Sequence, residues 1–413
     1  MVFLKQLLRP DMNPYVLALE GPDRLKQEFE RIGVDWRGSS IMVPKGFTRI
    51  VKISRLPSFL ANILKQEMLS LGGDAALSRD SITAKVKNTD CFILGNTAQI
   101  SSLIEKLKKQ PFGLALISDQ IKDAVANFER KVSVLDLLGK KVRFGRRTYI
   151  MGIVNVTPDS FSNDGILGAD AERSFEFARN IVQAGADILD IGGESTRPGS
   201  KRILAKEEIA RVLPLLKRMK GRFCVPVSID TTKSEVAHAA LDLGVGIVND
   251  ISALRFDKKM AKLIARYKAC VILMHMKGKP GTMQNDPRYK NVIEEILLFL
   301  SQAVKKALDA GIAEDKIIVD PGIGFGKKVA HNLEILKRLK ELKSLGRPIL
   351  VGLSRKSFIG KIVNADVGQR AWGTSAAVTF AIGQGADIVR VHDVKDTKQV
   401  VLMADALSRG GNN

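Results

Sequence analysis

The sequence predicts an α/β protein, a (β/α)8 TIM barrel with a small N-terminal α/β domain. From Tyr149 onward, short apolar runs alternate with segments of helical periodicity. Continuous runs rich in Val and Ile are typical of parallel strands covered on both faces. A doubly wound sheet is the alternative, but eight units over about 260 residues favour the barrel. The eight runs are IMGIVN (150–155), DILDIG (187–192), VPVSID (225–230), GIVND (246–250), CVILMH (270–275), KIIVD (316–320), PILVG (348–352) and DIVRVH (387–392).

The segments between these runs predict helices. ERSFEFARNIVQAGA (172–186) and HNLEILKRLKELKSLG (331–346) have 3.6-residue spacing and end in Gly or Gly-Ala, a signal for a helix C-terminus. Just before the first run, SVLDLLGKKVRFGRRTYI (133–150) predicts two short strands around Gly145. These strands could form a hairpin that closes the N-terminal face of the barrel.

Residues 1–132 differ in pattern and predict a small α/β domain, which leaves 133–413 as the barrel domain. SFLANILKQEMLSLGG (58–73) predicts an amphipathic helix, and CFILGN (91–96) predicts a buried strand. TAQISSLIEKLKKQ (97–110) predicts a second helix with Thr97 as its candidate N-cap.

The basic charge is the feature of the composition most open to misinterpretation. The chain has 65 Lys and Arg against 44 Asp and Glu, a net charge of +21, and the larger part of the excess lies in 133–413. Such a charge can indicate nucleic acid or an anionic membrane as partner. Aromatic residues make up only 6% of the chain and do not alternate with the basic ones, and zinc-finger, bZIP and RRM patterns are absent. We therefore expect an anionic small substrate, with no nucleic-acid or membrane partner.

The location of the protein is predicted to be the cytoplasm. No run approaches the roughly 18–20 apolar residues of a membrane span, and the N-terminal MVFLKQLLRP is interrupted by Lys5 and Arg9. Cys91, Cys224 and Cys270 are far apart and form no CxxC or Cys/His pattern. We expect them to be buried thiols in a reducing compartment.

Polar residues follow the predicted strands, at the end where barrel enzymes build their active sites. A loop cap or a solvated charge is the alternative explanation for any one of them, but that explanation is weak for all eight strand ends together. These residues are Asn155, Glu194 to Arg197, Asp230, Asn249 with Asp250, His275, Asp320, Ser354 to Lys356, and Arg390 with His392.

Two kinds of chemistry are present among these residues. Asp230, Asn249 and Asp320 offer acceptors and amide hydrogen bonds near the barrel axis, which suits a flat heterocycle that carries an amino group. Arg355, Lys356, Arg390 and His392 follow the last two strands, the usual phosphate site of this fold, and Arg suits bidentate contact with phosphate. One side of the predicted pocket is therefore acidic and the other binds an anion.

Two glycine-rich loops and one Met-rich run have competing interpretations. GGESTRPG (192–199) and PGIGFGK (321–327) would let backbone approach a ligand, with Arg197 and Lys327 beside it, but each could equally be a tight turn. PGIGFGK matches neither a Walker A loop nor GxGxxG. Met274-His275-Met276 could suggest copper, yet alternation along a strand favours core packing.

Eight motifs, in order, resemble dihydropteroate synthase. They are MGIVNVTPDSFS (151–162), GGESTRPGS (192–200), SIDTTK (228–233), VNDIS (248–252), LMHMKGKPGTMQ (273–284), VDPGIGFGK (319–327), GLSRKSFIG (352–360) and RVHDV (390–394). The resemblance implies condensation of 6-hydroxymethyl-7,8-dihydropterin pyrophosphate with p-aminobenzoate in folate biosynthesis, a cytoplasmic enzyme and a two-fold homodimer.

The resemblance also implies roles for individual residues. Asn155 would bind Mg²⁺ and pyrophosphate. Asp230, Asn249, Asp320 and Lys356 would hold the pterin, with Arg390 against its ring and Arg390 and His392 as anion anchors. The p-aminobenzoate site would contain Phe161, Thr196, Arg197, Pro198, Phe325 and Ser357. Asp320, Asp230, Lys356 and Arg390 would be the catalytic group, with Asp320 acting mainly by electrostatics in a dissociative substitution.

Two parts of the chain depart from the family pattern. The family usually has FSDGG in its first loop, whereas this chain has Phe161-Ser162-Asn163-Asp164-Gly165, so the loop aspartate is displaced by one position. Residues 1–132 lack motifs of the preceding pyrophosphokinase and resemble the N-terminal extension of some long bacterial synthases, most closely in MVPK (42–45) and ILKQEMLSLGGDAAL (63–77). A dimerisation or stabilising domain is the simplest interpretation.

Two rival functions remain open from the sequence. A pterin-binding methyltransferase would share the Asp/Asn pocket but would not use an anion site built from SRK and RVHDV. A folate-sensing or nucleic-acid-binding barrel without chemistry would be expected to lack pocket residues, and only the loop aspartate is shifted.

Overall fold

The computed structural model describes residues 14–19, 21–83, 85–137, 140–157, 171–195 and 202–410. It divides the chain into two compact units, Met1–Val125 and Ala126–Asn413, which are described separately. The sequence predicts this boundary after residue 132, seven residues later.

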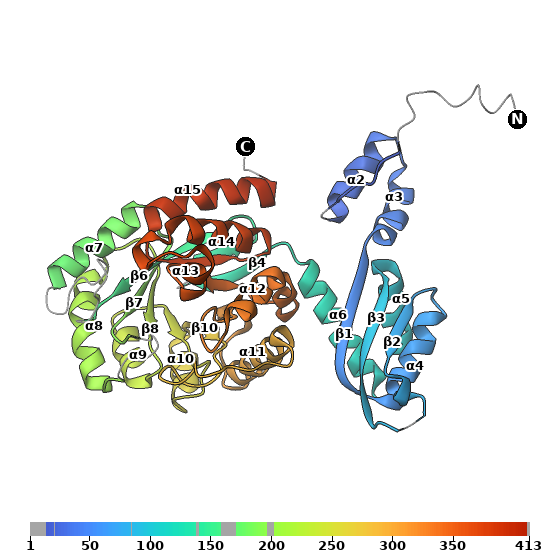
Figure 1. Cartoon of the computed structure of the whole chain (residues 1–413), viewed down its shortest axis with the longest axis horizontal. Coiled ribbons are helices and arrows are strands. Elements are labelled where there is room, and N and C mark those ends of the chain that lie inside the picture. Colours follow the sequence, from blue (N-terminus) through green and yellow to red (C-terminus); the bar gives the residue numbers. More distant parts are fainter. Residues whose placement is uncertain are drawn as a thin grey trace, which may run out of the picture. The chain divides into compact units, whose positions relative to one another are not determined.

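The N-terminal unit is built on a three-stranded antiparallel sheet of order β1-β3-β2. Helices α4 and α5 pack against it around a core that includes Leu64, Met68 and Ile93 (Figure 1). The elements are α2 (Pro22–Arg31), α3 (Trp36–Met42), β1 (Thr48–Pro57), α4 (Ser58–Leu69), β2 (Asp74–Leu77), β3 (Asn88–Asn96), α5 (Thr97–Leu107) and α6 (Leu114–Glu129).

The expected N-cap of α5 is wrong by one residue. Asn96 occupies that position, where its side chain accepts from the backbone N–H of Gln99 and the Gln99 side chain accepts from the N–H of Asn96. This reciprocal capping box satisfies two N–H groups that the helix leaves free. Thr97 is the first helical residue, and its hydroxyl donates instead to the carbonyl oxygen of Pro44.

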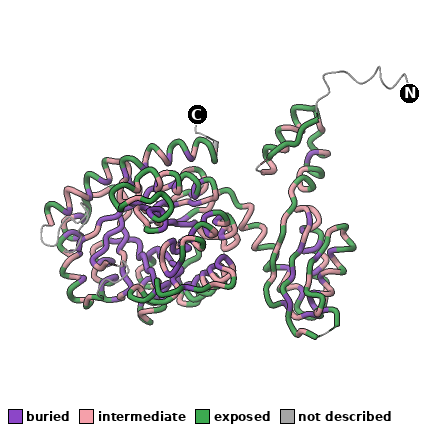
Figure 2. The backbone as a smooth tube through the Cα atoms, in the orientation of Figure 1, coloured by how far each residue is buried: buried purple, intermediate pink, exposed green. Residues whose placement is uncertain are grey.

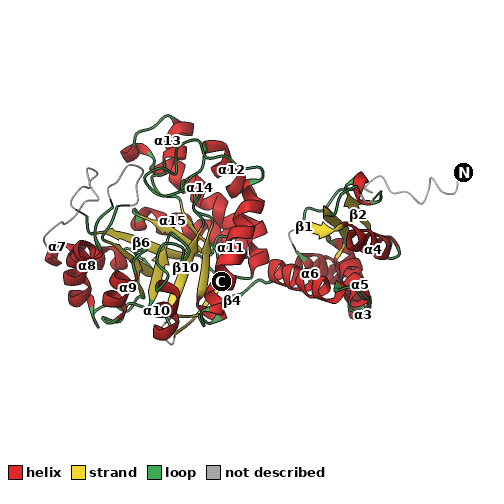
Figure 3. Cartoon of the chain, turned by 90° about the horizontal axis from the view of Figure 1, so that it is seen from below, coloured by secondary structure: helices red, strands yellow, loops and turns green. Residues whose placement is uncertain are grey.

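The second unit is the predicted barrel, and the prediction is confirmed. Eight parallel strands are hydrogen-bonded in the order β11-β10-β9-β8-β7-β6-β13-β12, and a parallel bridge between Val319 and Ile349 joins the two ends. Helices surround the strands in Figure 3. The strands are β6 (Tyr149–Asn155), β7 (Ile188–Gly192), β8 (Val227–Asp230), β9 (Ile247–Asp250), β10 (Cys270–Met274), β11 (Ile317–Asp320), β12 (Leu350–Gly352) and β13 (Ile388–Val391).

The helices of the barrel follow the predicted segments, with one correction. The segment 331–346 is not a single helix, because α12 ends at Lys337 and a 3₁₀ helix occupies Leu339–Leu345. Gly346 ends that segment with φ +67°. The helices are α7 (Ala171–Gln183), α8 (Ala205–Met219), α9 (Ser234–Leu241), α10 (Met260–Tyr267), α11 (Val292–Asp309), α12 (Val329–Lys337), α13 (Ser357–Val363), α14 (Ala371–Gly383) and α15 (Val394–Asp405).

Two apolar layers hold the barrel together. Side chains on the outer face of the strands pack against the helices, and the inner side chains at the N-terminal ends form a second cluster. Figure 2 shows the strands buried and the outer faces of the helices exposed. The alternation along β7 illustrates this arrangement, since Leu189 and Ile191 belong to the outer layer and Ile188 to the inner one.

A hairpin closes the N-terminal end of the barrel. Strands β4 (Ser133–Leu137) and β5 (Lys140–Phe144) pair antiparallel, and Leu135, Leu137 and Phe144 belong to the inner cluster. Both strands precede Gly145, so the expected position of the hairpin around that glycine is wrong. Gly145 has φ +93° and begins the connection to β6.

The cysteine prediction is correct for two of three residues. Cys91 and Cys270 are buried free thiols, whereas Cys224, just before β8, is exposed. Within the described part of the chain, no helix is both long and apolar enough to cross a bilayer.

Candidate active site

A cavity lies at the C-terminal ends of the barrel strands. Four predicted site residues on the strands line it, and Lys356 on the β12–α13 loop is a fifth. Inner-face residues at the ends of six strands, β8 to β13, reach it, because parallel strands present their C-terminal ends to one side of the barrel. Its lining comprises Asp230, Asn249, Ile251, Met274, Asp320, Gly322, Ile323, Phe325, Gly352, Lys356 and Arg390.

Arg390 is the central charge of this cavity. Its Nε donates to Asp190 Oδ2 at 2.6 Å and its Nη2 donates to Asp230 Oδ2 at 2.8 Å. Two carboxylates on neighbouring strands therefore hold one guanidinium from two sides. Burial raises the pKa of Asp230 to about 7, an effect that Arg390 opposes and the charge of Asp190 adds to.

Asn249 lies on β9 and is buried. Its side-chain amide Nδ2 donates to Asp190 Oδ2 at 3.1 Å. Its neighbour Asp250 serves the local turn instead, since that carboxylate accepts from the backbone N–H groups of Ser252 and Leu254. Only the first residue of the Asn249-Asp250 pair therefore contributes to the cavity.

Asp320 ends β11 and points into the cavity, where it is 5% exposed. The backbone N–H of Gly322 donates to its Oδ1 at 2.6 Å. Burial raises the pKa of Asp320 to about 6, although the Gly322 N–H and the charges of Lys356, Lys327 and Arg390 all favour the carboxylate. The carboxyl group thus titrates close to neutral pH, as is common for groups at functional sites.

Lys356 supplies a second cation to the lining of the cavity. Its Nζ lies 4.3 Å from the centre of the Phe325 ring, which is a cation–π contact. Lys356, predicted to hold the pterin, therefore contacts Phe325, predicted to contact p-aminobenzoate. Burial and the charge of Arg390 lower the pKa of Lys356 to about 8. The ammonium therefore exists at neutral pH but loses its proton more readily than an ordinary lysine.

The PGIGFGK loop is a built element of the site and more than a tight turn. Lys327 is buried, and its Nζ lies 3.0 Å from both His275 Nδ1 and the carbonyl oxygen of Phe325. Burial lowers the pKa of Lys327 to about 7 and that of His275 to about 2, so the imidazole of His275 is neutral near pH 7. Asn332 Oδ1 accepts from the N–H of Gly324 at 2.8 Å. These bonds fix the backbone on either side of Phe325.

The residues after β12 and β13 have different roles. His392 Nδ1 lies 3.0 Å from Ser354 Oγ, which connects the two strand ends. Arg355 has φ +59° and its guanidinium pairs with Asp393 at 2.7 Å, so this arginine connects two loops. Ser357 begins α13 and is exposed. Neither Ser357 nor His392 lines the cavity.

Asn155, the predicted magnesium ligand, lies at the end of β6 beside Gly192. It ends β6 in register with Gly192, and a Cβ added at Gly192 would lie 3.5 Å from Asn155 Oδ1 and 3.7 Å from the Cβ of Asp230. A side chain at position 192 would therefore contact this amide oxygen, which is a ligand type that Mg²⁺ accepts. Among the described residues, no three His, Cys, Asp or Glu side chains form a metal cluster.

Several predicted residues lie outside the described part of the chain. Phe161 and the altered segment 163–165 fall within 158–170, and Thr196, Arg197 and Pro198 fall within 196–201. Their assignments to p-aminobenzoate stay predictions.

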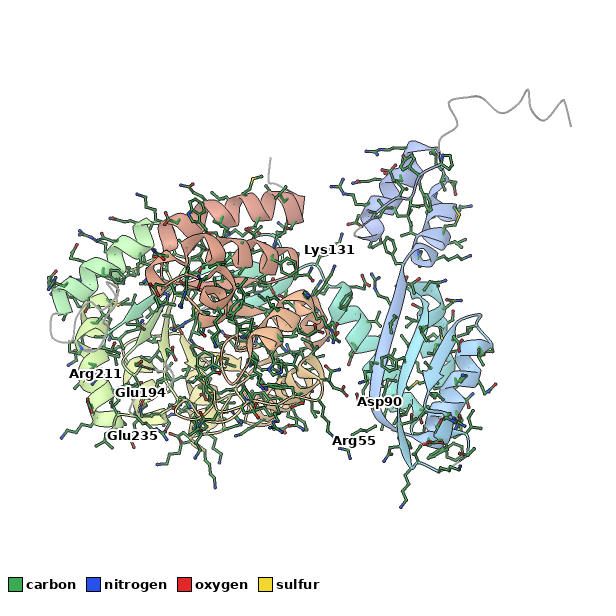
Figure 4. All side chains as sticks on the ribbon, in the orientation of Figure 1. Arg55, Asp90, Lys131, Glu194, Arg211 and Glu235 are labelled. Atoms are coloured by element: carbon green, nitrogen blue, oxygen red, sulfur yellow. The ribbon has the colours of Figure 1, made fainter. Side chains whose placement is uncertain are left out.

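The base of the GGESTRPG loop is held by an ion-pair network that connects the segments after β7 and β8 with helix α8. Lys233 Nζ contacts Glu194 Oε2 at 2.9 Å and Glu208 Oε2 at 2.5 Å, and Glu208 is fully buried. Glu194 Oε1 accepts from the N–H of Ile203. Arg211 donates to the carbonyl oxygen of Gly193, and Figure 4 shows Glu194 and Arg211 on the same side of the barrel. Both described ends of this loop are therefore anchored.

Asp190 is the residue that sequence reasoning missed. It belongs to the run DILDIG, which was interpreted only as a strand. Its signal is the alternation within that run, because Ile188, Asp190 and Gly192 share the inner face, and an acid there is unusual for a core position.

The arrangement can bind a flat polar heterocycle and an anion in one cavity. Two carboxyl groups and an amide line it together with the cations of Lys356 and Arg390. Buried carboxylates close to such a ligand would stabilise positive charge that develops on it, because the surrounding dielectric is low.

Comparison with known proteins agrees with this chemistry. Residues 151–392 match the model of the pterin binding enzyme family. The dihydropteroate synthase of Synechocystis sp. is 48% identical over 267 residues, which cover 64% of this chain and 92% of that protein. A crystal structure of dihydropteroate synthase from Clostridium difficile in the presence of pteroic acid has 46% identity and a TM-score of 0.60, and the match covers 64% of this chain and 98% of that one.

One relative extends the match into the N-terminal unit. A probable bifunctional folylpolyglutamate synthase/dihydropteroate synthase of Halobacterium salinarum is 37% identical over 390 residues, which are 94% of this chain and 46% of that protein. The barrel and its cavity, the family match over more than half of the sequence and the identities to these relatives together show that the chain belongs to the dihydropteroate synthases of the pterin binding enzyme family.

Proposed function

We propose that the barrel condenses 6-hydroxymethyl-7,8-dihydropterin pyrophosphate with p-aminobenzoate to give 7,8-dihydropteroate and pyrophosphate. The observation that carries this proposal is the convergence of Asp230, Asn249, Asp320, Lys356 and Arg390 on one cavity. The name of the relatives gives the reaction, and the pteroic acid named with the Clostridium difficile structure contains both halves of the product.

The binding of the pterin assigns a role to each side of the cavity. Carboxylates of Asp230 and Asp320 accept from the amino and ring N–H groups of the pterin, and the Lys356 ammonium donates to its carbonyl oxygen. Arg390, which Asp190 and Asp230 hold in place, lies against the ring and faces the pyrophosphate with His392. The p-aminobenzoate then contacts Phe325 and Ser357, together with Phe161, Thr196, Arg197 and Pro198.

The reaction separates charge before it forms the new bond. The bond between the pterin methylene carbon and the pyrophosphate oxygen breaks, and its electron pair leaves with pyrophosphate. Asp320 and Asp230 stabilise the positive charge left on the methylene and ring. The amino nitrogen of p-aminobenzoate then forms the carbon–nitrogen bond and loses one proton to water or to the departing pyrophosphate. Asn155 would hold Mg²⁺, which would supply positive charge to neutralise the leaving pyrophosphate.

The state and location of the enzyme complete the proposal. Membership of a family that commonly forms two-fold dimers supports a homodimer, and light scattering on the purified protein tests it.

The absence of a paired cysteine pattern supports a cytoplasmic location. Specific retention on DNA at physiological salt would contradict the expectation of small-molecule substrates only.

The direct test mixes the purified chain with Mg²⁺, p-aminobenzoate and the pterin pyrophosphate and measures dihydropteroate and pyrophosphate together. Equal amounts of both products support the proposal. No product, with methyl transfer from methyltetrahydrofolate instead, would overturn it in favour of the rival methyltransferase.

An Asp320→Asn variant tests the proposed mechanism. The neutral amide cannot stabilise the developing cation, so single-turnover release of pyrophosphate should slow by about 10²–10³-fold, the usual loss for one preorganised electrostatic group. Release at the normal rate would contradict the electrostatic role. A melting temperature close to that of the unaltered chain would show that the variant is folded.

A further inference from the structure

Asp190 is a buried acid for which the proposed reaction has no direct use. It lies in the middle of β7 with no exposed surface, on the inner face of the barrel. It does not line the cavity, so it is not positioned to contact substrate. Its contacts nevertheless lead to residues that do line it.

A single oxygen of Asp190 holds two site residues. Oδ2 accepts from Arg390 Nε at 2.6 Å and from Asn249 Nδ2 at 3.1 Å. Arg390 also donates to Asp230 through Nη2. The planar guanidinium is therefore bound on two sides and its orientation is fixed, because a fork of donors matched to two acceptors leaves it little freedom.

The bond to Asn249 decides which end of that amide faces away from the acid. Since Nδ2 is directed at Asp190, the amide oxygen is the end turned away from it. An oxygen in that position accepts a hydrogen bond and selects a ligand with an N–H donor. A neutral residue at position 190 that could donate would allow the amide to turn over and to select an acceptor instead.

A purely structural role explains these features less well. The other oxygen of Asp190 is buried with no hydrogen-bond partner among the described residues, which is costly for a carboxylate and would favour an apolar residue if packing were the sole requirement. Ser228, in register with Asp190 on β8, is equally buried and its hydroxyl also has no partner there. Ser228 therefore offers a matched buried position in the same layer that has no hydrogen bond to a site residue among those described.

We propose that Asp190 is a positioning residue for recognition of the pterin. It fixes the plane of Arg390 and the orientation of the Asn249 amide without contacting substrate. The role rests on the proposed function, since it assumes that the cavity takes a pterin.

The test compares Asp190→Asn with Ser228→Ala, a matched change in the same layer. Asp190→Asn keeps the shape but removes the charge and the fixed direction of the hydrogen bonds. The KM for the pterin pyrophosphate should rise about 10- to 100-fold, a loss typical of a misplaced binding group, and the KM for p-aminobenzoate should change less than about twofold. Ser228→Ala should leave both within about twofold, because its hydroxyl makes no hydrogen bond to a described site residue.

A double-mutant cycle separates positioning from general damage. In an Arg390→Gln background, Asp190→Asn should weaken binding of 6-hydroxymethylpterin, measured by calorimetry on the full chain, much less than it does alone. Full additivity, an equal rise of both KM values or an unchanged affinity for the pterin would each overturn the proposal. If Asp190→Asn does not fold, Asp190→Ser, which leaves room for water beside Arg390, takes its place in the same cycle.

The two proposals can fail separately. An unaltered chain that forms no dihydropteroate but binds 6-hydroxymethylpterin would refute the proposed reaction, and the cycle would still decide the role of Asp190. An unaltered chain that does not bind this pterin would overturn both.

Discussion

Gly322 is the position where the smallest possible side chain should do the most damage to the site. It has φ +67°, and a Cβ there would lie 2.0 Å from the carbonyl oxygen of His275 and 3.1 Å from its carbonyl carbon. These are backbone atoms, so no side-chain rotation can relieve the contact. The N–H of Gly322 also donates to Asp320 Oδ1 at 2.6 Å. A Gly322→Ala change must therefore displace either β10 or the loop that holds Asp320.

The expected loss of stability follows from two separate costs. A left-handed backbone costs an L-residue about 1–2 kcal/mol, and overpacking costs about 1–3 kcal/mol. Their sum is about 2–5 kcal/mol, which corresponds to roughly 5–15 °C in the melting temperature of a domain of this size. The pterin affinity should fall as well, because Asp320 loses the N–H that favours its carboxylate.

The assay is thermal unfolding together with calorimetric binding of 6-hydroxymethylpterin, with Gly281→Ala as control. Gly281 has no atom within 4 Å of an added Cβ and no positive φ, so that variant should behave like the unaltered chain. The reasoning is refuted if Gly322→Ala and Gly281→Ala unfold at the same temperature and bind the pterin equally well.

Two further predictions concern charge. Burial raises the folded pKa of Asp320 to about 6 and lowers that of Lys356 to about 8, so kcat/KM for the pterin pyrophosphate should rise with pH near 6 and fall above 8. In Lys356→Arg the fall should move to higher pH, because arginine stays protonated. A fall at the same pH in this variant would contradict the assignment to Lys356. In the unliganded protein the contribution of Asp320 to stability has the opposite sense, since its raised pKa makes that contribution largest below pH 4 and smaller as pH rises through 6. Lys233→Met leaves buried Glu208 without its ion pair and should lower the free energy of unfolding in urea by about 3–5 kcal/mol. The control Lys305→Met breaks the exposed pair with Asp309 and should change that free energy by less than about 1 kcal/mol. Equal losses in the two variants would refute the greater contribution of the buried pair.

The strands were predictable because parallel strands are covered on both faces and so appear as unbroken apolar runs. All eight expected runs contain a strand of the barrel. Their last inner-face residues were predictable too, since this fold places strand ends together. Local details such as helix caps were harder to predict. Asn96 and Thr97 are both good capping residues, and only the reciprocal bonds with Gln99 distinguish them.

The support of the site was not predictable from the sequence. Asp190 and Arg390 are 200 positions apart, and a pattern along the chain does not show which acid meets which base. Arg355 and Lys356 look equivalent in the sequence, yet the left-handed backbone at Arg355 directs its guanidinium to Asp393 while Lys356 reaches the cavity. The +21 charge is explained only in part, since Lys356 and Arg390 are few among 65 basic residues.

The hairpin at the N-terminal end of the barrel limits where this gene can be cut or fused. Leu135, Leu137 and Phe144 belong to the same inner cluster as Met151 and Ile188. A chain that began at the first barrel strand would lack these three side chains and would expose the rest of the cluster to water. An autonomous catalytic module must therefore start at or before Ser133. Exchange of the preceding unit for another, by recombination or by design, is compatible with catalysis only upstream of that point.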